Sequence, residues 1–123
     1  MKLAHTMIRV KDVEATLEFY TGFLGLTETR RLPIGDGATL IFLEDDRGAY
    51  QIELTVNEGK DDYVLGDQFG HLAFFTEDLE RVVADVESRG WWYRRSKPGM
   101  NSNYIFLKDP NGYDVEILER RPG

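Results

Sequence analysis

Two histidines and two glutamates carry the most suggestive chemistry in this sequence. His5 and His71 are the only histidines of the chain, and each opens a run in which residue character alternates as in a strand. Glu53 and Glu116 lie in two further alternating runs. Imidazole nitrogens and carboxylate oxygens bind divalent first-row metals, and a carboxylate can also move a proton. The four residues therefore suggest a metal site, with ordinary solvated or core positions as the alternative.

The sequence around the two histidines repeats. HTMIRVKDVEATLEFYTGFLG begins at His5, and HLAFFTEDLERVVADVESRG begins at His71, 66 residues later. Each segment leads to an aspartate that suits a helix N-cap, Asp12 or Asp78, and then to an amphipathic pattern that ends near a glycine. We therefore expect one helix in each half. The apolar residues at helical spacing are Val13, Leu17, Tyr20 and Leu24 in the first helix and Leu79, Val82, Val83 and Val86 in the second.

Three strand-like runs follow each expected helix, separated by turn-forming residues. They cover roughly 27–33, 38–44 and 49–56 in the first half and 91–96, 103–107 and 113–118 in the second. Each half is therefore predicted to be a βαβββ unit of an α+β fold. We expect a single domain, 1–123, made of two repeats at about 1–57 and 70–119 and joined by a polar linker, 58–69. Two such sheets, curved towards each other, would enclose a cavity suited to a ligand.

Strand alternation predicts which way the four residues point, because successive side chains of a strand face opposite sides of the sheet. His5 alternates with the aliphatic series of its run, and Glu53, His71 and Glu116 do the same in theirs. We assign each aliphatic series to the face beneath the helix and the four residues to the opposite face, which lines the cavity. The repetition favours a shared metal site over a face that simply meets water.

The composition limits the classes of partner. The formal net charge of -7 disfavours nucleic acid and anionic membranes, because both would repel the chain. No run approaches the ~20 apolar residues of a membrane span, so we expect a soluble cytoplasmic protein that binds a small molecule. The chain has no cysteine, which excludes disulfides, a cysteine nucleophile and thiolate metal ligands. Any metal must therefore be held by nitrogen and oxygen.

Five stretches together resemble glyoxalase I (lactoylglutathione lyase), in the vicinal oxygen chelate superfamily. They are HTMIRVKD, FYTGFLGL, IELTVNEG, FGHLAF and DPNGYDVEIL, and the resemblance covers about residues 1–119. It implies the glyoxalase/bleomycin-resistance/dioxygenase-like fold, with curved sheets around a metal-binding cavity. It also implies a homodimer with sites at the subunit interface. The implied reaction isomerises the hemithioacetal of methylglyoxal and glutathione, the co-substrate, to S-D-lactoylglutathione.

The resemblance also implies a role for each of the four residues. His5, Glu53, His71 and Glu116 match the family's four metal ligands. The short chain and the histidine at the first ligand position resemble the bacterial class activated by nickel or cobalt. The implied ion is therefore Ni²⁺, with Co²⁺ as an alternative and Zn²⁺ disfavoured. The metal would stabilise negative charge on the substrate oxygens, while Glu116 is the first choice for the base and Glu53 its partner.

Four further residues are implied to bind the substrate. Arg9 and Asn57 match family positions that contact the carboxylate of glutathione, and an arginine suits bidentate carboxylate binding. Lys97 and Met100 stand where the family has a Lys/Gly-rich loop, although the loop here is short. Asp67, before the FGH motif, would repel a carboxylate if it faced the pocket. The substrate could therefore contain a different thiol, or no thiol at all.

Other functions of the same fold are the alternatives. Acyl-CoA epimerases typically carry glutamine where Glu53 stands, and thiol transferases usually use three ligands. Extradiol dioxygenases use two histidines and one glutamate around iron. From a different class comes a metal-free module that binds small molecules and generally lacks the ligand set. The four intact ligands favour the isomerase over each of these.

Overall fold

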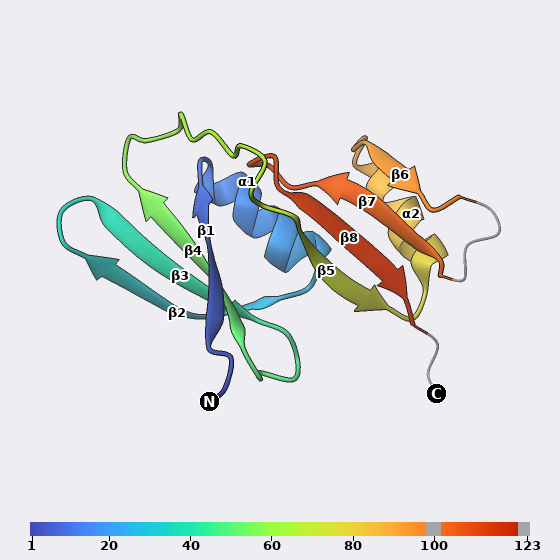
Figure 1. Ribbon diagram of the computed structural model, residues 1–123, viewed down its shortest axis with the longest axis horizontal. Helices are drawn as coiled ribbons and strands as arrows, with labels where there is room; N and C mark the ends of the chain where they lie inside the picture. Colours follow the sequence, from blue (N-terminus) through green and yellow to red (C-terminus); the bar gives the residue numbers. More distant parts are fainter. Residues whose placement is uncertain (98–101, 121–123) are drawn as a thin grey trace. The chain divides into compact units, whose positions relative to one another are not determined.

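The computed structural model describes residues 1–97 and 102–120, and the chain divides into two compact units, Met1–Val64 and Leu65–Gly123 (Figure 1). The division falls within the polar segment 58–69. Each unit contains one helical segment and one open four-stranded sheet. No helix within the described ranges is long and apolar enough to cross a membrane.

The first unit contains β1 (His5–Val10), α1 (Val13–Leu17), a π-helical segment η1 (Glu18–Phe23), β2 (Thr27–Ile34), β3 (Ala38–Glu44) and β4 (Gln51–Asn57). The strand order is β1-β4-β3-β2, with β1 and β4 parallel and the other pairs antiparallel. The turn between β2 and β3 uses Gly35 and Gly37 at positive φ values of 52° and 84°, which favour glycine. β4 begins two residues later than the run 49–56 predicts.

The second unit repeats this topology with β5 (His71–Thr76), α2 (Leu79–Ser88), β6 (Tyr93–Arg95), β7 (Tyr104–Lys108) and β8 (Asp114–Glu119). Its order is β5-β8-β7-β6, and β5 and β8 are parallel. Asp109 Oδ1 holds the turn between β7 and β8, since it accepts hydrogen bonds from the backbone N–H groups of Asn111 and Tyr113 at 2.8 and 2.9 Å. The predicted α+β fold of two βαβββ units is confirmed.

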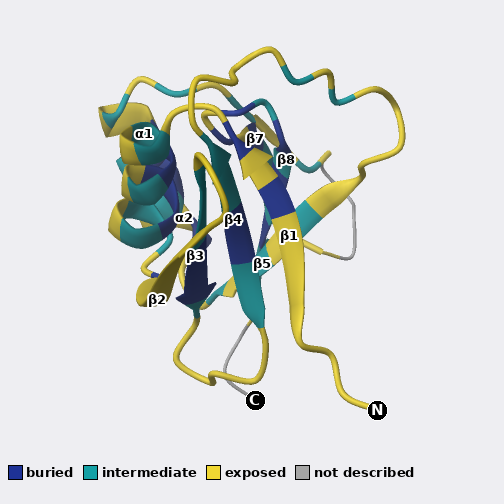
Figure 2. Cartoon of the chain, turned by 90° about the vertical axis from the view of Figure 1, so that its left-hand side faces the viewer, coloured by how far each residue is buried: buried dark blue, intermediate teal, exposed yellow. Residues whose placement is uncertain are grey.

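One face of each sheet is buried, and the other carries the candidate site. In β1, Ile8 and Val10 are buried, whereas the alternating residues Met7 and Arg9 are exposed. This confirms the alternation that the sequence predicts. Figure 2 shows β3 buried towards its C-terminal end and the edge strand β2 exposed along its length. The other strand residues of the two buried faces are Ile41, Leu43 and Leu54 in the first unit and Ile105, Leu107, Val115 and Ile117 in the second.

Both helical segments begin where the sequence predicts. The Asp12 carboxylate accepts a hydrogen bond from the backbone N–H of Ala15, and the Asp78 carboxylate accepts one from that of Arg81, each at 3.1 Å. Each aspartate therefore satisfies an N–H group that the first turn would otherwise leave unpaired. α2 buries its predicted apolar side through Leu79, Val83 and Val86.

The predicted first helix is only partly α-helical, because a π-helical turn follows Leu17. The Thr21 hydroxyl donates to the Leu17 carbonyl at 2.5 Å, and this carbonyl is the one that the Thr21 N–H would use in an α-helix. The Leu24 N–H reaches back five residues to the Phe19 carbonyl at 3.0 Å. The wider turn rotates the later side chains. Phe19 and Tyr20 are buried, while Leu17 and Leu24 are only half-buried.

The predicted run 91–96 is wrong at its start, because the end of α2 uses Trp91. Gly90 takes a positive φ of 72°, and the Trp91 N–H donates to the Val86 carbonyl at 3.2 Å. These are features of the Schellman closure of a helix. β6 therefore covers only the three residues from Tyr93 onward.

Candidate metal centre

The first histidine–glutamate pair lies on the face of its sheet opposite the buried core. β1 and β4 pair so that Met7 is opposite Glu53, and His5 lies two residues earlier on the same face. The Nε2 atom of His5 is 3.1 Å from Oε1 of Glu53. The Glu53 side chain is 11% exposed, whereas the His5 side chain is 40% exposed. A nearly buried carboxylate is thus paired with an imidazole that solvent reaches.

The second unit builds the same pair in the same way. Ala73 is opposite Glu116 in the β5–β8 pairing, and His71 again lies two residues earlier. The Nε2 atom of His71 is 3.4 Å from Oε1 of Glu116, and the two side chains are 44% and 15% exposed. The structure therefore brings the four predicted ligands together as two separate pairs, one in each unit.

A phenylalanine packs against each histidine. Phe42 is opposite Glu53 across the sheet, and Phe106 is opposite Glu116. The His5 and Phe42 ring centroids are 5.8 Å apart at an interplanar angle of 80°, and the His71 and Phe106 centroids are 5.1 Å apart at 86°. These edge-on contacts restrict the rotation of both imidazoles.

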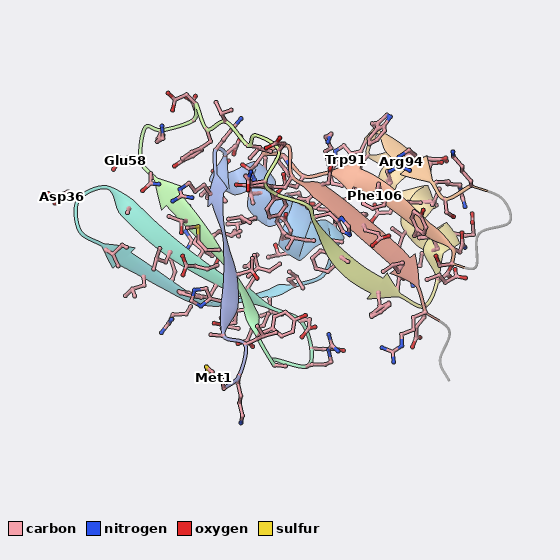
Figure 3. The ribbon with its side chains drawn as sticks, in the orientation of Figure 1. Met1, Asp36, Glu58, Trp91, Arg94 and Phe106 are labelled. Carbon is pink, nitrogen blue, oxygen red and sulfur yellow. The ribbon has the colours of Figure 1, made fainter. Side chains whose placement is uncertain are left out.

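An arginine covers each of these phenylalanine rings. The Arg30 guanidinium carbon lies 4.3 Å from the Phe42 ring centroid, and that of Arg94 lies 5.0 Å from the Phe106 centroid. Figure 3 places Arg94 beside Phe106. The sequence reasoning missed all four residues. The repeated triplet Ile-Phe-Leu at 41–43 and 105–107 is the signal that could have located the two phenylalanines.

The spacing within each pair fits two ligands of one metal ion. Two ligand atoms at ~2.1 Å from an ion are roughly 3.0 Å apart at a right angle and roughly 3.4 Å apart at a tetrahedral angle. The observed separations of 3.1 and 3.4 Å fall in that range. An imidazole nitrogen with a carboxylate oxygen is also a suitable donor set for Ni²⁺, Co²⁺ or Zn²⁺. The donors present therefore fit the implied metal.

Each unit contains only two of the four predicted metal ligands. Within residues 1–97 and 102–120, no group of three or more His, Cys, Asp or Glu side chains is gathered so that it could hold an ion. A four-ligand site therefore needs both pairs, and it belongs to the proposal below.

The two glutamates differ in what holds them. Thr55, on the same face two residues after Glu53, donates a hydrogen bond from its hydroxyl to Oε2 of Glu53 at 2.7 Å. Leu118 is the equivalent residue two positions after Glu116, and its side chain has no hydrogen-bonding group. Glu53 is therefore held through both oxygens. Among the described residues, Glu116 is paired only with His71.

Arg9 and Asn57 lie on the site face of the first sheet. Arg9 is opposite Thr55, two residues before Asn57 on β4. His5 is likewise opposite the residue two positions before Glu53. The side-chain amide of Asn57 donates to the Tyr63 hydroxyl at 2.7 Å. Lys60 lies 5.0 Å from the centre of the Tyr63 ring, and its hydrogen bond to a neighbouring aspartate raises its pKa. The sequence reasoning missed Tyr63, and nothing in the residue pattern indicated its contact.

The other predicted substrate residues lie in the second unit. Lys97 is exposed just after β6, and no described contact links it to His71 or Glu116. Met100 lies outside the described residues. Asp67 is exposed in the turn that precedes β5.

Comparison with known proteins places the chain in a family. The profile of the Glyoxalase/Bleomycin resistance protein/Dioxygenase superfamily matches residues 2–117. A probable lactoylglutathione lyase of Synechocystis is 36% identical, over 97% of this chain and 95% of the relative. The lactoylglutathione lyase of Haemophilus influenzae is 34% identical, over 98% and 94%. The chain spans about half the length of plant relatives, such as 45% of the lactoylglutathione lyase of Arabidopsis thaliana.

Solved structures agree with this assignment. The trypanothione-dependent glyoxalase I of Leishmania major is 30% identical, with a TM-score of 0.82 over 97% of this chain and 86% of that one. Glyoxalase I from Zea mays gives a TM-score of 0.87 at 29% identity, over 98% of this chain and 45% of that one. The chain therefore belongs to the Glyoxalase/Bleomycin resistance protein/Dioxygenase superfamily and is an enzyme of its glyoxalase I (lactoylglutathione lyase) group.

Proposed function

We propose that the chain is a metal-dependent glyoxalase I that isomerises the hemithioacetal of methylglyoxal and glutathione to S-D-lactoylglutathione. The observation that carries this proposal is the histidine–glutamate pair, built twice at one register offset with Nε2–Oε1 distances of 3.1 and 3.4 Å. His5, Glu53, His71 and Glu116 together hold one ion in this proposal. Ni²⁺ is the preferred ion, Co²⁺ is the alternative, and Zn²⁺ is disfavoured.

The ion, once bound, supplies Lewis-acid stabilisation of the negative charge that develops on the substrate oxygens. The protein must then move one proton from a substrate carbon to its neighbour. Glu116 is suited to this step, since its carboxylate has a single partner among the described residues, at 3.4 Å. Glu53 is the partner carboxylate on the other side.

The substrate's thiol part is proposed to bind beside the first pair. Arg9 is the cation that binds a carboxylate of glutathione, and Asn57 supplies an amide next to it. Lys97 is proposed to add a contact from the second unit, and the same is proposed for Met100, which lies outside the described residues. The trypanothione dependence of the Leishmania major relative is a reason to test other thiols beside glutathione.

The active form is proposed to be a homodimer with its sites at the subunit interface. Apolar side chains are exposed on the site face of the first sheet. They are Met7, Leu32 and Ile34, which are 37%, 42% and 44% exposed. A second copy of the chain would remove this apolar surface from water. Sedimentation of the purified protein should give the mass of a dimer, and a monomer at working concentrations would refute this part.

The deciding experiment is a thioester-formation assay with methylglyoxal and glutathione. Metal-free protein is reconstituted with Ni²⁺, Co²⁺ or Zn²⁺, and turnover is measured for each ion. We expect the highest activity with Ni²⁺. An absence of turnover with every ion would refute the proposed reaction. A melting temperature that does not change when any of the three ions is added would instead favour a metal-free binding module.

A further inference from the structure

The hydroxyl of Thr55 distinguishes two glutamates that otherwise occupy equivalent places. It donates to Oε2 of Glu53 at 2.7 Å, while Oε1 of the same carboxylate is 3.1 Å from His5 Nε2. A hydroxyl bound to a carboxylate at this distance makes a charge-assisted hydrogen bond, which is shorter and stronger than a neutral one. Both oxygens of Glu53 are thus held, and the residue is 8% exposed. The carboxylate is fixed in orientation before any ligand arrives.

The second unit lacks this device. In the first sheet Thr55 lies opposite Arg9. In the second sheet Leu118 lies opposite Phe75 at the equivalent register position, so Leu118 occupies the place of Thr55. An aliphatic side chain cannot donate a hydrogen bond. The Glu116 carboxylate is therefore held by His71 alone among the described residues, at 3.4 Å. The fold repeats the pair but secures only one of its two carboxylates.

This asymmetry matters because, in the proposed function, the two carboxylates have different tasks. A permanent ligand gains affinity from a neighbouring group that fixes its orientation. A carboxylate that moves a proton between two carbons must instead shift its oxygen from one to the other. A second hydrogen bond would oppose that shift. The hydroxyl is found beside Glu53 and is missing beside Glu116.

We propose that Thr55 is a positioning residue that fixes Glu53 as the permanent carboxylate ligand, and that the apolar Leu118 leaves Glu116 free to move the proton. The part about Glu116 rests on the proposed function, whereas the part about Glu53 requires only that the chain binds a metal.

The first part is tested by titrating metal-free protein with Co²⁺ and recording its visible absorption. Thr55→Val keeps the shape of the side chain and removes the hydroxyl. We expect it to weaken Co²⁺ binding about 10- to 100-fold and to change the spectrum. Thr55→Ser restores the hydroxyl and should return both to the wild-type values. Leu118→Val is the matched control and should bind Co²⁺ as the wild type does.

Wild-type affinity and an unchanged spectrum in Thr55→Val would overturn the fixing of Glu53. Equal melting temperatures of the metal-free variant and wild type establish that the variant is folded. If Thr55→Val does not fold, Thr55→Ala replaces it in the same titration. None of these measurements needs turnover, so they remain decisive if the chain has no glyoxalase activity.

The second part is tested by the reverse substitution, Leu118→Thr, which gives Glu116 the hydroxyl that Glu53 has. Co²⁺ affinity should stay at the wild-type level or rise, while kcat should fall about tenfold with KM little changed. Leu118→Val separates loss of the leucine side chain from gain of the hydroxyl. An unchanged kcat in Leu118→Thr, with wild-type activity in the control, would overturn the assignment of Leu118.

Discussion

The two units of the chain place a histidine, a glutamate, a phenylalanine and an arginine at matching register positions, but they surround the glutamate differently. In the first unit, Thr55 adds a hydrogen bond to Glu53, and in the second Leu118 adds none to Glu116. A repeated fold therefore does not give the two glutamates identical surroundings. The register produces the pair, and the residue two positions later decides how firmly the carboxylate is held.

The neighbours of the histidines differ as well. Gln51 is opposite His5 and donates to Glu44 at 2.7 Å. The equivalent residue opposite His71 is Asp114, which pairs with Lys108. One imidazole thus has an amide beside it, and the other has an ion pair. Both pairs nevertheless keep nearly the same distance, which indicates that strand register rather than local charge sets the geometry.

The largest expected effect is on turnover in Glu116→Gln. The amide cannot accept the substrate proton, so kcat should fall by about 10²- to 10⁴-fold while the protein still binds Ni²⁺. Steady-state kinetics and metal analysis of the same preparation measure both. Glu53→Gln is the comparison, and its main loss should be metal affinity. Wild-type turnover in Glu116→Gln would refute its role as base.

The next effect is on metal binding in His5→Ala and His71→Ala. Each variant removes one ligand, so calorimetric titration should give an affinity for Ni²⁺ reduced by more than about 100-fold in both. The two losses should be similar, because the pairs have similar geometry. Arg47→Ala changes an exposed residue of the turn between β3 and β4 and serves as the control. Full affinity after loss of either histidine would show that its unit does not contribute to the ion.

A smaller effect is expected from Tyr63→Phe, in the unit that holds Arg9. The substitution removes the hydroxyl that accepts a hydrogen bond from the side-chain amide of Asn57 at 2.7 Å. Loss of one such hydrogen bond corresponds to about 0.5–1.5 kcal/mol, so KM for the hemithioacetal should rise about 2- to 12-fold. The value of kcat and the affinity for metal should stay the same. An unchanged KM would mean that the Asn57 contact does not position the substrate.

The smallest expected effect is on stability, in Asp78→Ala at the start of α2. The carboxylate that accepts from the Arg81 N–H at 3.1 Å is lost, and an N-cap of this kind contributes about 1 kcal/mol. Denaturant unfolding measures the change, with the neighbouring surface variant Glu77→Ala as control. Asp12→Ala makes the same change in the first unit. Equal stability of Asp78→Ala and wild type would contradict the capping role.

Much of the fold followed from alternation and helix signals. The faces of β1, β4, β5 and β8 could be predicted because a strand has a period of two, and the N-caps because aspartate satisfies free N–H groups. The π-helical turn could not, since the spacing of apolar residues does not reveal that the Leu24 N–H bonds to a carbonyl five residues back rather than four. The late start of β6 likewise depends on the cap made by Trp91.

The site was predictable only as far as its faces. Alternation placed His5 and Glu53 on one side of the sheet, but their contact depends on the parallel register of β1 with β4, which the residue pattern does not contain. The hydrogen bond from Thr55 to Glu53 joins residues of one strand, and alternation could only place them on the same side. The choice of metal and of reaction came from the family resemblance, since a histidine–glutamate pair fits several ions.

The central claim is that both pairs serve one metal ion that is needed for turnover. Metal-free protein is titrated with Ni²⁺ while thioester formation from methylglyoxal and glutathione is followed. The account predicts that activity rises from zero and reaches its plateau when one ion is bound for each chain. A plateau at two ions for each chain, or full activity without added metal in chelator-treated protein, would contradict it.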